Sequence, residues 1–99
     1  MKINFNQSNI KFKKGTVILA SAGPGDPNLI TLKLKYIITL ADVVIFDALV
    51  NNKILNLCKP NAKLIYAGKL KERKACTQSE INEWLVKYSK KNKKVLRLK

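Results

Sequence analysis

The stretch at residues 17–31 reads VILASAGPGDPNLIT and decides the fold. It opens with the aliphatic residues Val17 to Leu19, a short apolar run typical of a buried strand. Two glycines and two prolines follow within Gly23 to Pro27; glycine permits positive φ and close approach of a ligand, whereas proline fixes φ near about −65°. A helical pattern then begins at Thr31. The stretch therefore predicts a strand, a ligand-binding loop and a helix.

The loop matches neither of two common nucleotide-binding motifs. A P-loop ends in Gly-Lys-Ser/Thr, and this chain has Asp26 and Pro27 in that place. A dinucleotide-binding loop has a third glycine where this chain has Asn28. Two interpretations stay open on these residues: a loop that binds another ligand, or an ordinary β–α turn that binds none.

The composition is that of a small, basic, globular chain. Its 99 residues suffice for one domain at most, and a hydrophobic content of 46% excludes wholesale disorder. Eighteen lysines and two arginines against six acidic residues give a net charge of +14. This charge suits an acidic partner such as nucleic acid, an anionic membrane surface or a polycarboxylate substrate, but a lysine-biased coding background produces it as well. Two arginines are too few for base reading.

Neither an export signal nor a metal site is expected. The apolar run Val17 to Ala20 is shorter than the ~7–15 residues of an export signal, and no stretch approaches the ~18 residues of a membrane span. We therefore expect a cytoplasmic protein with no membrane partner. The chain has no histidine, and Cys58 and Cys76 lack metal-binding spacing. We expect two free thiols and no metal.

The rest of the chain alternates strand and helix patterns. Strands are expected at residues 16–21, 43–46, 62–67 and 94–98, and helices at 31–41, 52–58 and 77–92. Thr31 and Asn51 are good N-caps, and Thr77 forms a capping box with Glu80. The alternation predicts an α/β fold with a parallel sheet. Residues 1–14 are expected to form a basic, loosely ordered leader, and residues 15–99 the domain.

Three candidate site residues each follow a predicted strand. They are Pro24, Asp47 and Lys69. Because ligands of parallel sheets bind beyond the carboxyl ends of the strands, we expect these residues to converge on one edge of the sheet.

Several segments, in order, resemble the tetrapyrrole methylase family, whose members use S-adenosylmethionine. They are AGPGDPNLITLK, ADVVIFDALV, AGK, TQSEINEWLV and KKVLRLK, all within residues 16–99. Their combination is similar to the uroporphyrinogen-III C-methyltransferase branch, which acts in siroheme and cobalamin synthesis. The resemblance implies the amino-terminal half of a tetrapyrrole methylase fold. It also implies C-methylation of uroporphyrinogen III to precorrin-2, with S-adenosyl-L-methionine as methyl donor.

The resemblance further implies roles for individual residues. Asp47 would accept a proton and Lys69 would donate one. An electron-rich pyrrole carbon attacks the sulfonium methyl in line, so a nearby carboxylate can receive the ring proton that the new bond expels. The alternatives are that Asp47 only caps the following turn and that Lys69 is only a solvated loop charge. The residues expected to contact S-adenosyl-L-methionine are Gly23, Pro24, Gly25 and Asp26.

The chain departs from the family pattern in two places. Leu70 and Lys74 stand where the family usually has an arginine and a histidine, which affects the expected substrate contacts. Family members also continue past RLK into a Gly-Gly-Asp-Pro loop that forms the other wall of the cofactor site, and then into a second α/β domain. We therefore expect a truncated domain, inactive alone, with apolar surface uncovered beside Val95 to Leu98.

Two sets of partners follow from these expectations. For the methylase interpretation, the partners are uroporphyrinogen III, a second copy in a homodimer of the complete enzyme, or a separately encoded carboxyl-terminal half, and no nucleic acid. A protein of another class stays open as the alternative. It is a small nucleic-acid-binding module that uses Lys69 to Lys74 and the lysine-rich tail from Lys87.

Overall fold

The computed structural model describes residues 12–22 and 27–99. Within them the elements are β1 (Val17–Ala20), η2 (Pro27–Leu29), α1 (Leu32–Leu40), β2 (Val43–Phe46), α2 (Asn52–Leu55), β3 (Lys63–Tyr66), α3 (Gln78–Lys90) and β4 (Val95–Leu98). The strands form one sheet in the order β1-β4-β2-β3, and every neighbouring pair is parallel. The α/β class with a parallel sheet is thus confirmed.

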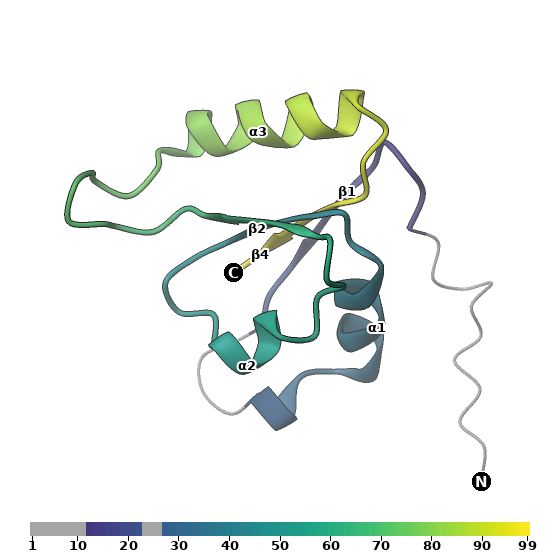
Figure 1. Ribbon diagram of the computed structural model, residues 1–99. Coiled ribbons are helices and arrows are strands. Elements are labelled where there is room, and N and C mark those ends of the chain that lie inside the picture. The colour runs from purple at the N-terminus through teal and green to yellow at the C-terminus, as the bar shows by residue number, and fades with distance from the viewer. Residues whose placement is uncertain (1–11, 23–26) are drawn as a thin grey trace, which may run out of the picture.

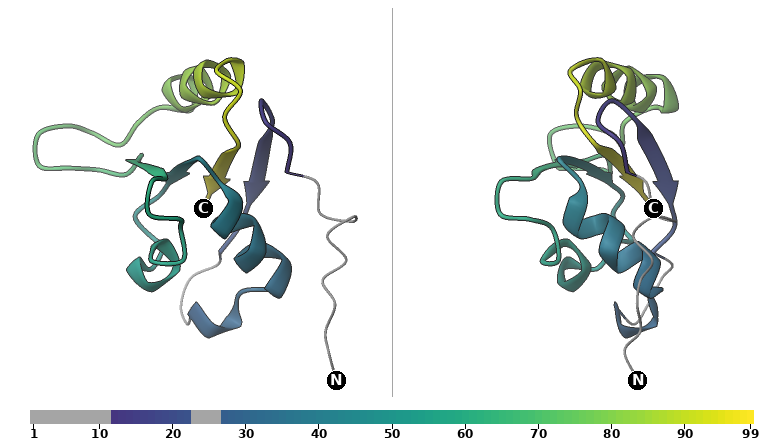
Figure 2. Two further views of the ribbon diagram at one scale, coloured as in Figure 1. Left: turned by 45° about the vertical axis from the view of Figure 1, so that its right-hand side comes forward. Right: turned by 90° about the vertical axis from the view of Figure 1, so that its right-hand side faces the viewer.

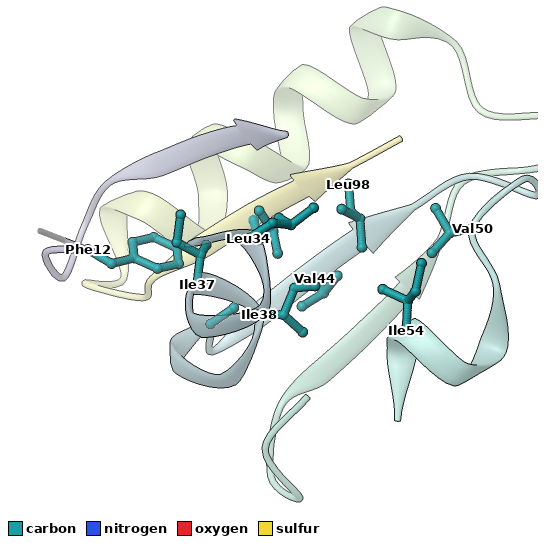
Figure 3. Packing of buried hydrophobic residues seen from close by; sticks show 10 residues of the cluster. Phe12, Leu34, Ile37, Ile38, Val44, Val50, Ile54 and Leu98 are labelled. Atoms are coloured by element: carbon teal, nitrogen blue, oxygen red, sulfur yellow. The ribbon is translucent and has the colours of Figure 1, made fainter. Parts of the chain in front are cut away.

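The helices cover both faces of the sheet. Helices α1 and α2 lie on one face and α3 lies on the other (Figure 1, Figure 2). The two inner strands, β2 and β4, are buried between these layers and are largely apolar, as parallel strands with two covered faces are. Figure 3 shows the larger core between α1, α2 and the sheet. Its buried residues are Phe12, Leu34, Ile37, Ile38, Ala41, Val44, Val50, Ile54, Leu96 and Leu98.

The second core lies under α3. Ile81 and Tyr88 of the helix pack against Val43, Ile45 and Val95 of the sheet. Trp84 and Leu85 of the predicted apolar helix face are only partly buried against this cluster.

Strand β4 is central, which the sequence analysis did not anticipate. It pairs with β1 on one side and with β2 on the other, and Val95, Leu96 and Leu98 are completely buried. The expectation of uncovered apolar surface at this strand is therefore wrong. The exposed apolar side chains of the sheet belong to its edge strands instead: Leu19 of β1 is 71% exposed and Leu64 of β3 is 45% exposed.

The predicted helix caps are present. Thr31 Oγ1 accepts a hydrogen bond from the Leu34 amide (3.0 Å), and Asn51 Oδ1 accepts one from the Lys53 amide (2.8 Å). The capping box at Thr77 and Glu80 is complete, with N···O distances of 3.2 and 3.1 Å. These side chains satisfy amides that the first helical turn leaves without partners.

Helix α2 ends earlier than predicted. It stops at Leu55 rather than Cys58, because the Leu57 and Cys58 amides bond to Ile54 and Leu55, three residues back, in a tighter turn. Cys58 and Cys76 are both free, as expected, and each is partly buried.

Phe12 belongs to the core although it falls within the expected leader. It is 6% exposed, and Gly15 beside it adopts φ +78°, a conformation that favours glycine. The Gly15 amide bonds to the Lys93 carbonyl (3.0 Å), which joins this segment to the start of β4. Residues 1–11 of the expected leader lie outside the described residues, so its loose order stays a prediction.

Asp42, just before β2, bonds to residues that precede β3 and β4 at the amino-terminal edge of the sheet. Its carboxylate pairs with Lys59 Nζ and accepts a hydrogen bond from the Lys94 amide (2.8 Å). Partial burial alone would raise the pKa of Asp42, but the hydrogen bonds from Lys59 and Lys94 outweigh it and the pKa is lowered.

Candidate active site

Asp47 and Lys69 line the same cavity at the carboxyl edge of the sheet, as predicted. Asp47 directly follows β2, Lys69 lies just beyond β3, and both line one open cavity of about 440 Å³. The chain leaves β2 toward α2 on one face and leaves β3 toward α3 on the other (Figure 1). Such a point of divergence is where parallel α/β sheets bind their ligands.

The Asp47 carboxylate is held by a buried arginine. Arg97 Nη2 donates to Asp47 Oδ1 at 2.7 Å, and the side chains of Arg97 and Asp47 are 5% and 36% exposed. Arg97 Nη1 donates to the carbonyls of Ile45 (3.3 Å) and Leu98 (3.2 Å). Arg97 Nε is buried and has no partner among the described residues. Arg97 thereby fixes the carboxylate at the mouth of the cavity.

This pairing bears on the alternative that Asp47 only caps the turn after β2. The turn is closed by the Asp47 backbone carbonyl, which accepts from the Val50 amide (3.2 Å). Among the described residues the side-chain bond of Asp47 goes to Arg97 and not to that turn. Capping therefore does not explain the position of the carboxylate.

Lys69 stands on a loop that a second arginine anchors. Arg73 donates to the carbonyls of Tyr66 (2.7 Å) and Gly68 (3.0 Å) and to Cys76 Sγ (3.1 Å). The Tyr66 ring packs against Gly68 so closely that a Cβ at this position would require the ring to move. Lys69 itself is exposed. Its backbone is thus positioned, while the alternative of a solvated loop charge stays open.

The loop residues that depart from the family pattern do not line the cavity. Leu70 and Lys74 are exposed, whereas Ala75, Cys76 and Gln78 line the cavity together with Lys69.

Sequence reasoning missed Arg73 and Arg97 as site residues. They are the two arginines of a chain that otherwise uses lysine, and Arg97 interrupts the apolar strand VLRL. A guanidinium is the cation best suited to a buried, multiply bonded position. The use of arginine in a lysine-rich chain, together with its place inside an apolar strand, is the sequence feature that could have indicated a role for Arg97.

The expected cofactor residues Gly23, Pro24, Gly25 and Asp26 lie outside the described residues. The chain just before them is fixed at the same edge, since the Ala22 amide bonds to the Lys99 carbonyl (2.8 Å) and the Lys99 amide to Ala20 (3.0 Å). An open cavity of about 460 Å³ lies beside β1 and α1. It has apolar walls, including Ile18, Ile30 and Ile37, and polar groups from Ser21, Thr31 and Lys33.

The fold and the site together define a class of protein. A parallel α/β sheet with two cavities at its carboxyl edge, one of them holding a fixed carboxylate near a lysine, is typical of a domain that binds and transforms a small molecule. Over the described residues no helix is long and apolar enough to cross a membrane.

The chain belongs to the tetrapyrrole (corrin/porphyrin) methylase family, whose sequence model matches residues 16–99. It is 49% identical over 85 residues to a uroporphyrinogen-III C-methyltransferase of Bacillus subtilis, covering 86% of this chain and 33% of that protein. It is 51% identical over 85 residues to the enzyme of the same name from Methanocaldococcus jannaschii, covering 86% and 35% of the two chains. The chain thus spans about a third of the length of these relatives.

Solved structures of the same family share the fold. The structure of a cobalt precorrin-4 methyltransferase superposes with a TM-score of 0.71 at 28% identity, over 83% of this chain and 32% of that one. A uroporphyrin-III C-methyltransferase of Thermus thermophilus, in complex with S-adenosylhomocysteine, gives a TM-score of 0.63 at 35% identity, over 83% and 31%.

Proposed function

We propose that this chain forms the amino-terminal part of an S-adenosyl-L-methionine-dependent methyltransferase that converts uroporphyrinogen III to precorrin-2. The observation that carries the proposal is the Asp47 carboxylate, fixed by Arg97 in the same cavity as Lys69 at the sheet's point of divergence. The family and its uroporphyrinogen-III C-methyltransferase relatives support the reaction class.

The bound cofactor would supply an electrophilic methyl group on a sulfonium. The cavity beside β1 suits such a ligand, because its apolar walls can cover a purine ring and its polar groups can bond the ribose or the amino-acid end. Gly23, Pro24, Gly25 and Asp26 would contact it, as the resemblance to the family implies. The relative solved with S-adenosylhomocysteine supports this assignment.

Methylation of a fully substituted pyrrole carbon would leave a ring cation, and Asp47 would accept the proton that this cation then loses from the ring N–H or an adjacent bridging methylene. Arg97 bonds to Oδ1, and no described residue bonds to Oδ2, so one carboxylate oxygen remains to take a proton. Lys69, which lines the same cavity, would donate a proton to the tetrapyrrole or bind one of its carboxylates. Both roles require correct placement more than strong acidity.

The proposal is tested by methyl transfer in the protein at its natural length. We expect methyl-labelled S-adenosylmethionine to label uroporphyrinogen III, and the label to appear only when both substrates are present. A folded protein that binds S-adenosylmethionine but never labels uroporphyrinogen III would contradict the proposed substrate.

Residues 1–99 expressed alone should bind the cofactor weakly. Cofactor affinity depends on burying most of the ligand in a cleft, and the two cavities described at the carboxyl edge are open. We expect calorimetry to detect no binding tighter than about 1 mM, or about −4 kcal/mol, and no methyl transfer. Micromolar binding by these residues would show that the described cavities already suffice.

A further inference from the structure

Lysines gather at the edge of the sheet opposite the candidate active site. The exposed lysines near the beginnings of β1, β3 and β4 and the end of α3 are Lys13, Lys14, Lys63, Lys87, Lys90, Lys91 and Lys93. We call this set the basic edge. Two acidic side chains lie near this set: Asp42, which Lys59 and the Lys94 amide already engage, and Glu83, one helical turn before Lys87 on α3. Among the described residues none of the seven lysines forms an ion pair, so the set carries a large excess of positive charge.

Three of these ammonium groups converge on one aromatic ring. Nζ of Lys63, Lys87 and Lys91 lie 5.2, 5.4 and 5.8 Å from the centroid of the Tyr88 ring. Tyr88 is buried, and a hydrogen bond from Lys63 lowers the pKa of its phenol. The ring attracts each cation, whereas the like charges gathered around it repel one another. A polyanion that bridges them would relieve this repulsion.

Backbone bonds bring the other lysines onto the same surface. The Lys93 amide bonds to the Tyr88 carbonyl (3.2 Å), and the Lys93 carbonyl accepts from the Gly15 amide (3.0 Å), two residues after Lys13. Thr16 Oγ1 also donates to the Lys13 carbonyl (2.5 Å). Lysines separated by up to 80 positions in the sequence thus form one continuous charged edge.

We propose that the basic edge binds the phosphodiester backbone of nucleic acid without reading its sequence. This goes beyond the proposed methyl transfer and differs from the expectation of no nucleic-acid partner. Lysine is a point charge that suits phosphate, whereas Arg73 and Arg97, the side chains suited to bases, are committed elsewhere. Tyr88 is too buried to stack on a base. An anionic membrane fits less well, because in the described part of the chain this edge exposes no aromatic side chain for insertion.

The basic edge differs from the nucleic-acid-binding surface that the sequence suggested. That surface combined Lys69 to Lys74 with the lysines from Lys87 onward. Lys69 lies beyond the carboxyl end of β3, and Lys99 lines the same cavity, whereas the lysines from Lys87 to Lys94 precede β4. One duplex contact would therefore use the basic edge alone.

The test measures binding of the full chain, at its natural length, to a fluorescent DNA duplex and to two duplexes of unrelated sequence. Between about 0.05 M and about 0.3 M salt, we expect log K to fall against log[salt] with a slope between roughly −3 and −6, equal for all sequences. Lys63→Gln, Lys87→Gln and Lys91→Gln combined should weaken binding at least about tenfold and make the slope shallower by roughly 2 to 3.

A matched control separates this edge from overall charge. Lys35→Gln, Lys53→Gln and Lys71→Gln remove the same charge from exposed positions elsewhere and should weaken binding far less. Circular dichroism would establish that both variants are folded, and these measurements do not depend on methyl transfer. Equal weakening by the two triple variants, or tighter binding to vesicles containing phosphatidylserine than to DNA at the same salt, would overturn the proposal.

Discussion

Arg97 is the residue on which the candidate site depends most. It lies in the central strand, is 4% exposed, and has Asp47 as its carboxylate partner. Removing one member of a buried ion pair costs most when the charge left behind cannot reach water. The two members are unequal in this respect, since the Asp47 side chain is 36% exposed and that of Arg97 only 5%.

This inequality gives a stability prediction for two single variants. Asp47→Ala should lower the free energy of unfolding by about 1–3 kcal/mol, because it orphans a buried guanidinium. Arg97→Met should cost less, since the carboxylate left behind can be hydrated and the methionine fills apolar space. Urea unfolding of both variants checks this. A larger loss for Arg97→Met would mean that the bonds of Arg97 to the Ile45 and Leu98 carbonyls matter more than the ion pair.

Asp42 gives a pH prediction. Its pKa is lowered in the folded chain, so the stability it contributes is complete above its unfolded value of about 3.9 and is lost as the pH falls through the lower folded value. Asp42→Asn should therefore flatten the loss of stability below about pH 4 and cost about 1–3 kcal/mol at neutral pH. Glu83→Gln, at an exposed position, is the control. Identical acid unfolding of Asp42→Asn and the unsubstituted chain would contradict this role.

For the individual helices and strands, local sequence patterns were sufficient to predict where the strands lie and which residues cap the helices. β2 has the predicted bounds, β1, β3 and β4 lie within their predicted ranges, and the Thr31, Asn51 and Thr77 caps form as predicted. These features depend on neighbouring residues. The order of the strands in the sheet does not depend on neighbouring residues, because it is set by how segments far apart in the sequence pack together. The central place of β4 and the pairing of Arg97 with Asp47, 50 residues apart, were therefore not predictable from local pattern.

The central place of β4 can be tested with two leucines in strands. Leu96→Ala should lower the free energy of unfolding by about 2–5 kcal/mol, since Leu96 is completely buried in the larger core. Leu64→Ala on edge strand β3 should cost about 1 kcal/mol or less, because Leu64 is 45% exposed. Chemical denaturation of both variants measures the difference. Equal costs would place β4 at an edge of the sheet.

At the scale of the whole molecule, the two edges of the sheet carry different chemistry. The carboxyl edge holds the candidate active site, where Asp47 and Lys69 line one cavity, and the amino-terminal edge carries the seven lysines of the basic edge. Parallel pairing causes this separation, because it sends every strand end to one side and every strand beginning to the other. The roles of Asp47, Lys69 and the loop Gly23 to Asp26 remain predictions.

The most direct test of the account is Asp47→Asn in the protein at its natural length. Asparagine keeps an oxygen that can accept from Arg97 but cannot serve as a proton acceptor. We predict that kcat for methyl transfer to uroporphyrinogen III falls by about 100-fold or more, while the Kd for S-adenosylmethionine stays within about twofold. An unchanged kcat in this variant, with the fold intact, would show that Asp47 only positions Arg97 and would contradict the proposed proton transfer.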